Sequence, residues 1–171
     1  MRKGDLEMKK NKLNPVVIWT NVISVVFLAA LVAVLFLPAW DYKDGVLTIA
    51  EYVGFPTKKL SLLKDFRAAY GLSKDFGVND VVTVPVMTML IAIAGAAATW
   101  IFKKFPLGSV AAIVSGTWAL ITYLTAPVFT NAHSSLYLVI AAAAALVVGL
   151  ACLAIAIISI VKEEKKILTE K

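Results

Sequence analysis

Four long stretches without a charged side chain or a histidine constrain this chain more than any other feature. They cover residues 15–37, 82–102, 107–126 and 136–161. A helix of about 20 residues crosses the roughly 30 Å hydrocarbon core of a bilayer, so each stretch is long enough to span a membrane once. The chain of 171 residues is 60% apolar, and its mean hydropathy is +0.84. We therefore predict an all-α membrane protein, a bundle of four transmembrane helices.

The distribution of basic residues predicts the orientation of the spans. Lysine and arginine gather in the tail 1–14, the turn 103–106 and the tail 162–171. The segment 38–81 balances six bases with six acids over 44 residues, and the loop 127–135 has no base. Basic residues favour the cytoplasmic side. We expect both termini in the cytoplasm, the 44-residue segment outside, and the plasma membrane as the location. A cleaved secretory signal is the alternative for the first stretch, but that stretch is longer than a signal core.

The outer segment 38–81 carries two competing local patterns and one clearer helix. Asp44-Gly45 predicts a tight turn between two short extended arms. Thr48 and Glu51 have capping-box spacing, which favours a short helix instead, and both interpretations stay open. Residues 58–70 predict an amphipathic helix, whose apolar side must be covered by lipid, by the bundle or by a partner. The residues that we predict to bind a partner are Trp40, Phe55, Leu63, Phe66 and Tyr70.

Helix-capping residues support the spans independently of hydropathy. Asn14 supplies a capping oxygen directly before Pro15, which suits the first position of a helix. Asp80 or Thr83 is predicted to cap the second span, so that Pro85 lies in its first turn. Small residues recur every four positions in the last two spans, at Gly108, Ala112, Gly116, Ala141, Ala145 and Gly149. Because helices in lipid associate through close van der Waals contact, these faces predict a compact bundle.

Polar side chains within the spans are few and uncharged. Intramembrane charge is typical of proton relays and ion pathways, and the four stretches carry none. The amide of Asn21 cannot be fully satisfied within its own helix, so we expect it to bond across the bundle rather than to contact a ligand. Thr117 is a second intramembrane polar residue, and the hydroxyls in general are expected to bond to carbonyls of the preceding turn. Trp118, in mid-span, is expected to pack inside.

No residue pattern predicts catalysis or metal binding. His133 is the single histidine, and a metal site or a lipid-modifying enzyme would need it to meet carboxylates such as Asp41, Asp44 or Asp75 from another loop. The lone Cys152 allows no intramolecular disulfide. Phosphate-binding loops, nucleophile elbows and zinc spacings are absent from the sequence. We therefore expect no enzyme activity, no cofactor and no metal. We also expect no nucleic-acid binding, because the basic residues flank membrane spans.

The layout of four spans with a long first outer loop and a short second one is similar to the claudin and tetraspan arrangement. The claudin outer loop has tryptophans and two cysteines, whereas here Trp40 stands without a following cysteine. Three stretches, residues 36–40, 52–56 and 82–85, more closely resemble small uncharacterised four-span membrane proteins of Gram-positive bacteria. That resemblance implies a bacterial source and no particular activity.

The sequence favours a non-enzymatic accessory or assembly subunit of a larger membrane complex, for example a solute transporter. Its expected partners are membrane lipids and that larger membrane protein, and its oligomeric state stays open. The alternative is a small homo-oligomeric transport or channel protein. Its polar path would have to use Asn21, Ser115, Thr117, Thr122 and Tyr123.

Overall fold

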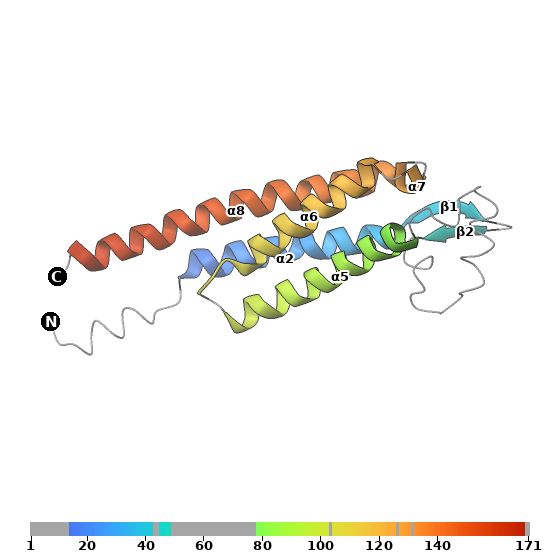
Figure 1. Ribbon diagram of the computed structural model, residues 1–171. Helices are drawn as coiled ribbons and strands as arrows, with labels where there is room; N and C mark the ends of the chain where they lie inside the picture. The colour runs from blue at the N-terminus through green and yellow to red at the C-terminus, as the bar shows by residue number, and fades with distance from the viewer. Residues whose placement is uncertain are drawn as a thin grey trace.

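The structure, a computed structural model, describes residues 14–42, 45–48, 78–102, 104–125, 127–130 and 132–169 (Figure 1). The predicted helix at residues 58–70 lies outside these ranges. Four long helices make up most of the described chain. In order, the elements are α2 (Pro15–Ala33), the 3-10 turn η1 (Val34–Phe36), β1 (Pro38–Tyr42), β2 (Gly45–Thr48), α5 (Val78–Ile101), α6 (Leu107–Thr125), α7 (Pro127–Thr130) and α8 (Ser135–Thr169).

The four long helices run side by side and define two ends of the molecule (Figure 1). We call the end where β1 and β2 project the hairpin end. We call the opposite end, where α2 begins, α5 turns into α6 and α8 finishes, the basic end. Helices α2 and α6 pack against each other and each packs against both α5 and α8. They therefore form the centre of the bundle, with α5 and α8 on its two sides.

Helix α2 begins where the sequence predicts, and together with η1 it ends at Phe36, one residue before the predicted end at Leu37. Asn14 is its N-cap, and its side-chain Oδ1 accepts hydrogen bonds from the backbone N–H of Val16 at 2.9 Å and of Val17 at 3.4 Å. Pro15 takes the first helical position, where a missing N–H costs nothing. The helix tightens into η1, and the chain becomes extended at Leu37.

The prediction for the start of the second span is wrong. Helix α5 begins at Val78, four residues before the predicted start, so Asp80 and Thr83 lie within it rather than before it. Pro85 consequently lies in the second turn and not in the first. A proline there removes one backbone hydrogen bond, and transmembrane helices accommodate such a loss.

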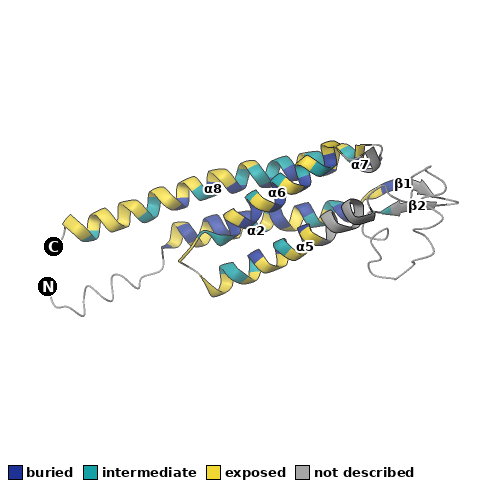
Figure 2. Ribbon diagram, viewed as in Figure 1, coloured by how far each residue is buried: buried dark blue, intermediate teal, exposed yellow. Residues whose placement is uncertain are grey.

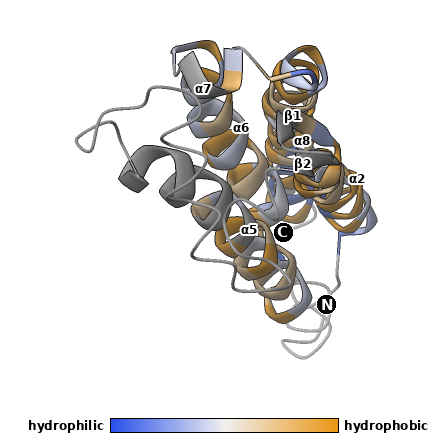
Figure 3. Cartoon of the chain, turned by 90° about the vertical axis from the view of Figure 1, so that its right-hand side faces the viewer, coloured by the Kyte–Doolittle hydropathy of each residue, from blue (hydrophilic) through white to orange (hydrophobic). Residues whose placement is uncertain are grey.

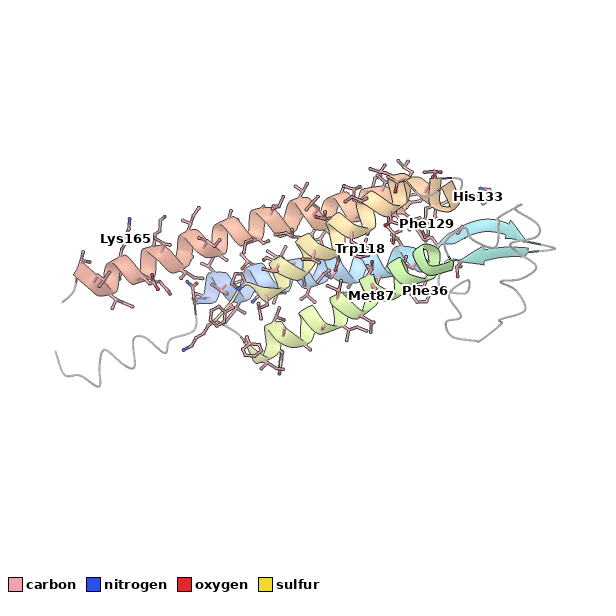
Figure 4. All side chains as sticks on the ribbon, viewed as in Figure 1. Phe36, Met87, Trp118, Phe129, His133 and Lys165 are labelled. Carbon is pink, nitrogen blue, oxygen red and sulfur yellow. The ribbon has the colours of Figure 1, made fainter. Side chains whose placement is uncertain are left out.

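Helices α6 and α8 match the third and fourth predicted stretches, and α8 extends beyond its stretch. Helix α6 ends at Thr125, and the predicted loop 127–135 contains the single-turn helix α7. Helix α8 has 35 residues, which at 1.5 Å each make it about 52 Å long, well beyond the roughly 30 Å of a bilayer core. Its last turns, which carry Lys165, are exposed and extend past the other helices (Figures 2 and 4). The helix therefore continues through the charged segment 162–166, beyond the predicted fourth stretch.

Strands β1 and β2 form an antiparallel hairpin at the end of η1. Trp40 pairs with Leu47 and Tyr42 with Gly45, and the register shifts between Pro38 and Trp40. The predicted extended arms are therefore confirmed. Thr48 belongs to β2, and residues 49–53 of the competing short helix lie outside the described ranges.

Close approach between helices depends on glycine, as the small-residue pattern predicts. A Cβ on Gly116 would lie 2.7 Å from the backbone nitrogen of Leu146 on α8. A Cβ on Gly149 of α8 would lie 3.0 Å from the backbone nitrogen of Ile113 on α6. Both helices thus present a glycine to the backbone of the other, which brings α6 and α8 into direct main-chain contact.

The long helices consist mainly of hydrophobic residues (Figure 3), and many of these are exposed on the outside of the bundle. Large exposed side chains include Trp19, Ile93, Trp100 and Val147. Among the described helices, Pro15–Phe36, Leu107–Thr125 and Ser135–Thr169 are long and apolar enough to cross a membrane, and Leu90–Ile101 is a shorter apolar helical stretch. A soluble protein does not expose apolar surface on this scale, whereas lipid covers it without cost.

Candidate functional site

Asn21 makes the cross-bundle contact that the sequence predicts. Its Nδ2 donates to the backbone oxygen of Phe105 at 2.9 Å, and its Oδ1 accepts from the backbone N–H of Gly108 at 3.0 Å. Gly108 is the second residue of α6, whose first N–H groups have no partner within the helix. Asn21 therefore caps α6 from another helix and fixes the turn between α5 and α6. The side chain is buried, and its role is structural.

Two further polar pairs join helices near the basic end, and the sequence analysis missed both. The hydroxyl of Ser24 donates to the carbonyl of Thr20 at 2.8 Å and lies 3.1 Å from the hydroxyl of Ser109 on α6. Because Ser24 has one hydroxyl proton, Ser109 is the donor between them. Asn14 Nδ2 donates to Ser159 Oγ on α8 at 2.9 Å. These pairs tie α2 to α6 and to α8, and only the packing brings their members together.

The expectation that hydroxyls bond to the preceding turn holds for some residues and is wrong for others. Thr20 donates to the carbonyl of Val17 at 3.0 Å, and Thr99 to that of Ala96 at 2.7 Å. Four buried hydroxyls find no partner among the described residues, and they belong to Thr88, Ser115, Tyr123 and Ser134. The predicted polar residue Thr117 is half-buried on α6.

The hairpin end has a compact apolar core of its own. The rings of Tyr123 and Phe129 meet edge to face, with centroids 5.1 Å apart and planes at 68°. Leu35, Ala39 and Leu138 are fully buried in the same cluster. The backbone oxygen of Ala39, in β1, accepts from the N–H of His133 at 2.8 Å, near the labelled position of His133 in Figure 4. The base of the hairpin is thus fixed to the bundle.

A cleft opens between α2 and α5 on the opposite half of the molecule. It has a volume of about 530 Å³, within the roughly 300–1,000 Å³ of ligand pockets. Asn21 and Thr99 are its polar lining residues, and Trp100 lies at its edge with 78% of its surface exposed. The remaining lining residues are Ile18, Val22, Val25, Val26 and Ala96.

The predicted partner-binding residues fall largely beyond the described chain. Trp40 lies in β1, and nothing is described of its side chain. Phe55, Leu63, Phe66 and Tyr70 lie outside the described ranges. Trp118 is 49% exposed on α6, so the prediction that it packs inside the bundle is wrong. Its neighbours Ser115 and Ala119 take the buried positions instead, because they face the other helices.

Within the described residues, no three His, Cys, Asp or Glu side chains could hold a metal ion together. His133 is exposed at the hairpin end, while Cys152 is buried on α8. Some of the polar side chains that the bundle buries serve helix–helix bonds, as at Asn14, Asn21 and Ser24. Such bonds position helices and do no chemistry by themselves.

Comparison of the chain with protein-family models, with curated proteins and with solved structures finds no match. The resemblance to small four-span bacterial proteins therefore stays a prediction. The chain is predominantly helical, and three of its described helices are long and apolar enough to cross a membrane. It is therefore a membrane protein.

Proposed function

We propose that this protein is a non-enzymatic accessory or assembly subunit that packs beside a larger membrane protein and presents its hairpin end to that partner. In this proposal the chain crosses the plasma membrane four times, with α5 as the additional span. Both termini lie in the cytoplasm and segment 38–81 outside. The positive-inside distribution of lysine and arginine supports this orientation.

One observation carries the proposal: the hairpin is an ordered element built on the end of the bundle. Ala39 is fully buried and its carbonyl is bonded to His133 across the chain. A β-hairpin of two short strands is marginal by itself, so this attachment supplies the order that a docking element needs. Among the described residues the sheet has two strands, and the outer edge of a strand can pair with an extended segment of another chain. Asn21 and Ser24 are meanwhile committed to bonds between helices.

Photocrosslinking in native membranes tests the proposal. A photoreactive phenylalanine analogue replaces Trp40 on the hairpin in one protein and Trp118, exposed on α6, in a control. We expect position 40 to give one discrete crosslinked companion, recovered in constant ratio after purification in a mild detergent. Position 118 should give lipid adducts only. Recovery as a lone monomer from several mild detergents, without a crosslink at position 40, would overturn the proposal.

A reporter fused after Lys171 tests the orientation. It should be active on the cytoplasmic side only, because the four-span arrangement places both ends there. Activity of the reporter outside the cell would refute the even number of spans or the orientation.

A small transport or channel protein is the second candidate. The buried hydroxyls of Thr88, Ser115 and Tyr123, which find no partner among the described residues, support it, because a solute path needs polar groups that structural bonds have not consumed. Solute flux into liposomes that contain the purified protein, compared with a Ser115→Val variant, tests this function. Absence of flux with the unmodified protein removes it.

A further inference from the structure

The end of α8 carries a basic face directly beyond the apolar part of the helix. We propose that Lys162 and Lys165, with Lys166 beside them, bind the phosphate headgroups of anionic phospholipids. All three lysines are helical and exposed. The site requires only that α8 crosses the membrane, so it is independent of the hairpin end used by the proposed function.

The basic face continues the side of α8 that is exposed within the apolar stretch. Residues three, four or seven positions apart lie on the same side of a helix. Ile155 and Ile158 are 51% and 55% exposed, and Lys162 and Lys165 follow Ile158 after four and seven residues. Figure 4 shows Lys165 on the side of α8 that is turned away from the other helices. The side of α8 that meets lipid therefore becomes basic where the helix leaves the bilayer.

The acidic residues of the same segment point in other directions. Glu163 follows the buried Ala156 after seven residues and the buried Cys152 after eleven, so it lies on the side of α8 that faces the bundle. Glu164 directly precedes Lys165, and consecutive helical residues do not share a face. The separation of the charges around the helix leaves the lipid-facing side basic.

A contact between helices places the lysines at the level of the phosphates. Asn14, the N-cap of α2, donates to Ser159 of α8 at 2.9 Å. The 22 residues of Pro15–Phe36 are about 33 Å long and match the bilayer core, so Ser159 lies near its boundary. Lys162 and Lys165 are then about 4.5 and 9 Å beyond the boundary. A headgroup layer is about 5–7 Å thick, and a long lysine side chain can reach back into it.

A lipid fits this face better than a protein partner does. Lys162 is three residues from Lys165 and four from Lys166, so their like charges repel within the helix and an anion between them relieves the repulsion. A second copy of the chain packed symmetrically through the same face would bring further lysines against them. Lipids are present all around this side of α8, and basic residues next to a membrane span attract anionic headgroups.

Fluorescence quenching by brominated lipids tests the proposal in full-length protein reconstituted into liposomes. The reporter is Ile158→Trp, at an exposed position one turn before Lys162, in a protein with phenylalanine at the four natural tryptophans. The probes are phosphatidylglycerol and phosphatidylcholine brominated near the headgroup. We expect the reporter to prefer the anionic lipid between about fivefold and 25-fold, which corresponds to a factor of about five from one or from both lysines.

A charge swap separates the position of the lysines from the net charge. Lys162→Glu combined with Glu163→Lys keeps the net charge and depth but moves one positive charge from the lipid-facing side to the bundle side. It should lower the preference at least about fivefold, and Lys162→Gln combined with Lys165→Gln should abolish it. Glu163→Gln, which also changes the net charge, should leave it unchanged. Circular dichroism checks that each variant is folded, and Ile155→Trp replaces the reporter if Ile158→Trp does not fold.

Three outcomes would overturn the proposal. In the first, the reporter binds the anionic and the zwitterionic lipid equally. In the second, the preference survives the double glutamine variant or the charge swap, which would assign it to the overall charge of the basic end. In the third, the reporter is shielded from both brominated lipids and becomes accessible when the protein is diluted in the bilayer, which would assign this face to a second copy of the chain.

Discussion

The substitution Gly116→Ala tests the main-chain contact between α6 and α8. A Cβ at this position would lie 2.7 Å from the backbone nitrogen of Leu146 and 2.9 Å from the backbone oxygen of Ala142. Both atoms belong to the backbone of α8, so no side chain can rotate away to admit the methyl group. The two helices must separate locally, and the contacts on either side of Gly116 must loosen with them.

The expected loss is the difference between two effects. Overfilling a well-packed interior costs about 1–3 kcal/mol. Alanine favours the helix over glycine by about 1 kcal/mol, which offsets part of this cost. Because the methyl group meets backbone atoms, the upper part of the overfilling range applies, about 2–3 kcal/mol. After the offset we expect the free energy of unfolding to fall by about 1–2 kcal/mol, which is a factor of about 5 to 30 in the folded-to-unfolded ratio.

Unfolding in mixed detergent micelles measures this loss. The helical circular-dichroism signal is followed as the mole fraction of dodecyl sulfate rises. The control is Ala154→Val, which adds methyl groups at an exposed position of α8 and should leave the midpoint close to that of the unmodified protein. A Gly116→Ala protein as stable as the unmodified one, or more stable, would show that α6 and α8 do not approach as closely as the structure places them.

Three further substitutions test the polar contacts, with the same unfolding assay. Asn14→Ala removes the cap of α2 and its bond to Ser159 and should cost about 1 kcal/mol or more; an unchanged midpoint would contradict the cap. Asn21→Leu should cost about 1 kcal/mol and speed amide exchange at Gly108, whose N–H loses its acceptor; unchanged exchange would contradict that bond. Tyr123→Phe should leave stability within about 0.5 kcal/mol or raise it, because a buried hydroxyl without a partner contributes no hydrogen bond; a loss above about 1 kcal/mol would reveal a partner.

The positions of the helices could be predicted because each depends on local sequence. Uncharged apolar stretches locate α2, α6 and α8, since the length of a helix that crosses a bilayer is fixed by the bilayer. Asn14 and Pro15 locate the start of α2, because capping depends on neighbouring residues alone. The start of α5 could not be predicted in the same way: the two candidate capping residues, Asp80 and Thr83, lie close together, and the helix begins before both of them.

The contacts of the candidate site residues could not be predicted from local sequence, because they depend on how the helices pack. The sequence indicated that Asn21 needs a partner, but the partner is the backbone at Phe105 and Gly108, which every residue possesses. The pairing of Ser24 with Ser109 is equally invisible, since hydroxyls are scattered through all the spans. Trp118 shows the converse, because an aromatic residue in mid-span suits either the interior or the lipid and only the rotation of α6 decides between them.

The amino-acid sequence by itself determined that this chain consists mainly of apolar helices, because hydropathy and helix capping act over a few positions. After the first helix the sequence left a β-hairpin and a short helix as alternatives, and the structure shows the hairpin. The tertiary structure decided which helix faces meet, where glycine brings two backbones together, and where α2 and α5 leave a cleft. In lipid the apolar faces of a helix are nearly equivalent by composition, so side-chain shape and a few hydrogen bonds select among them.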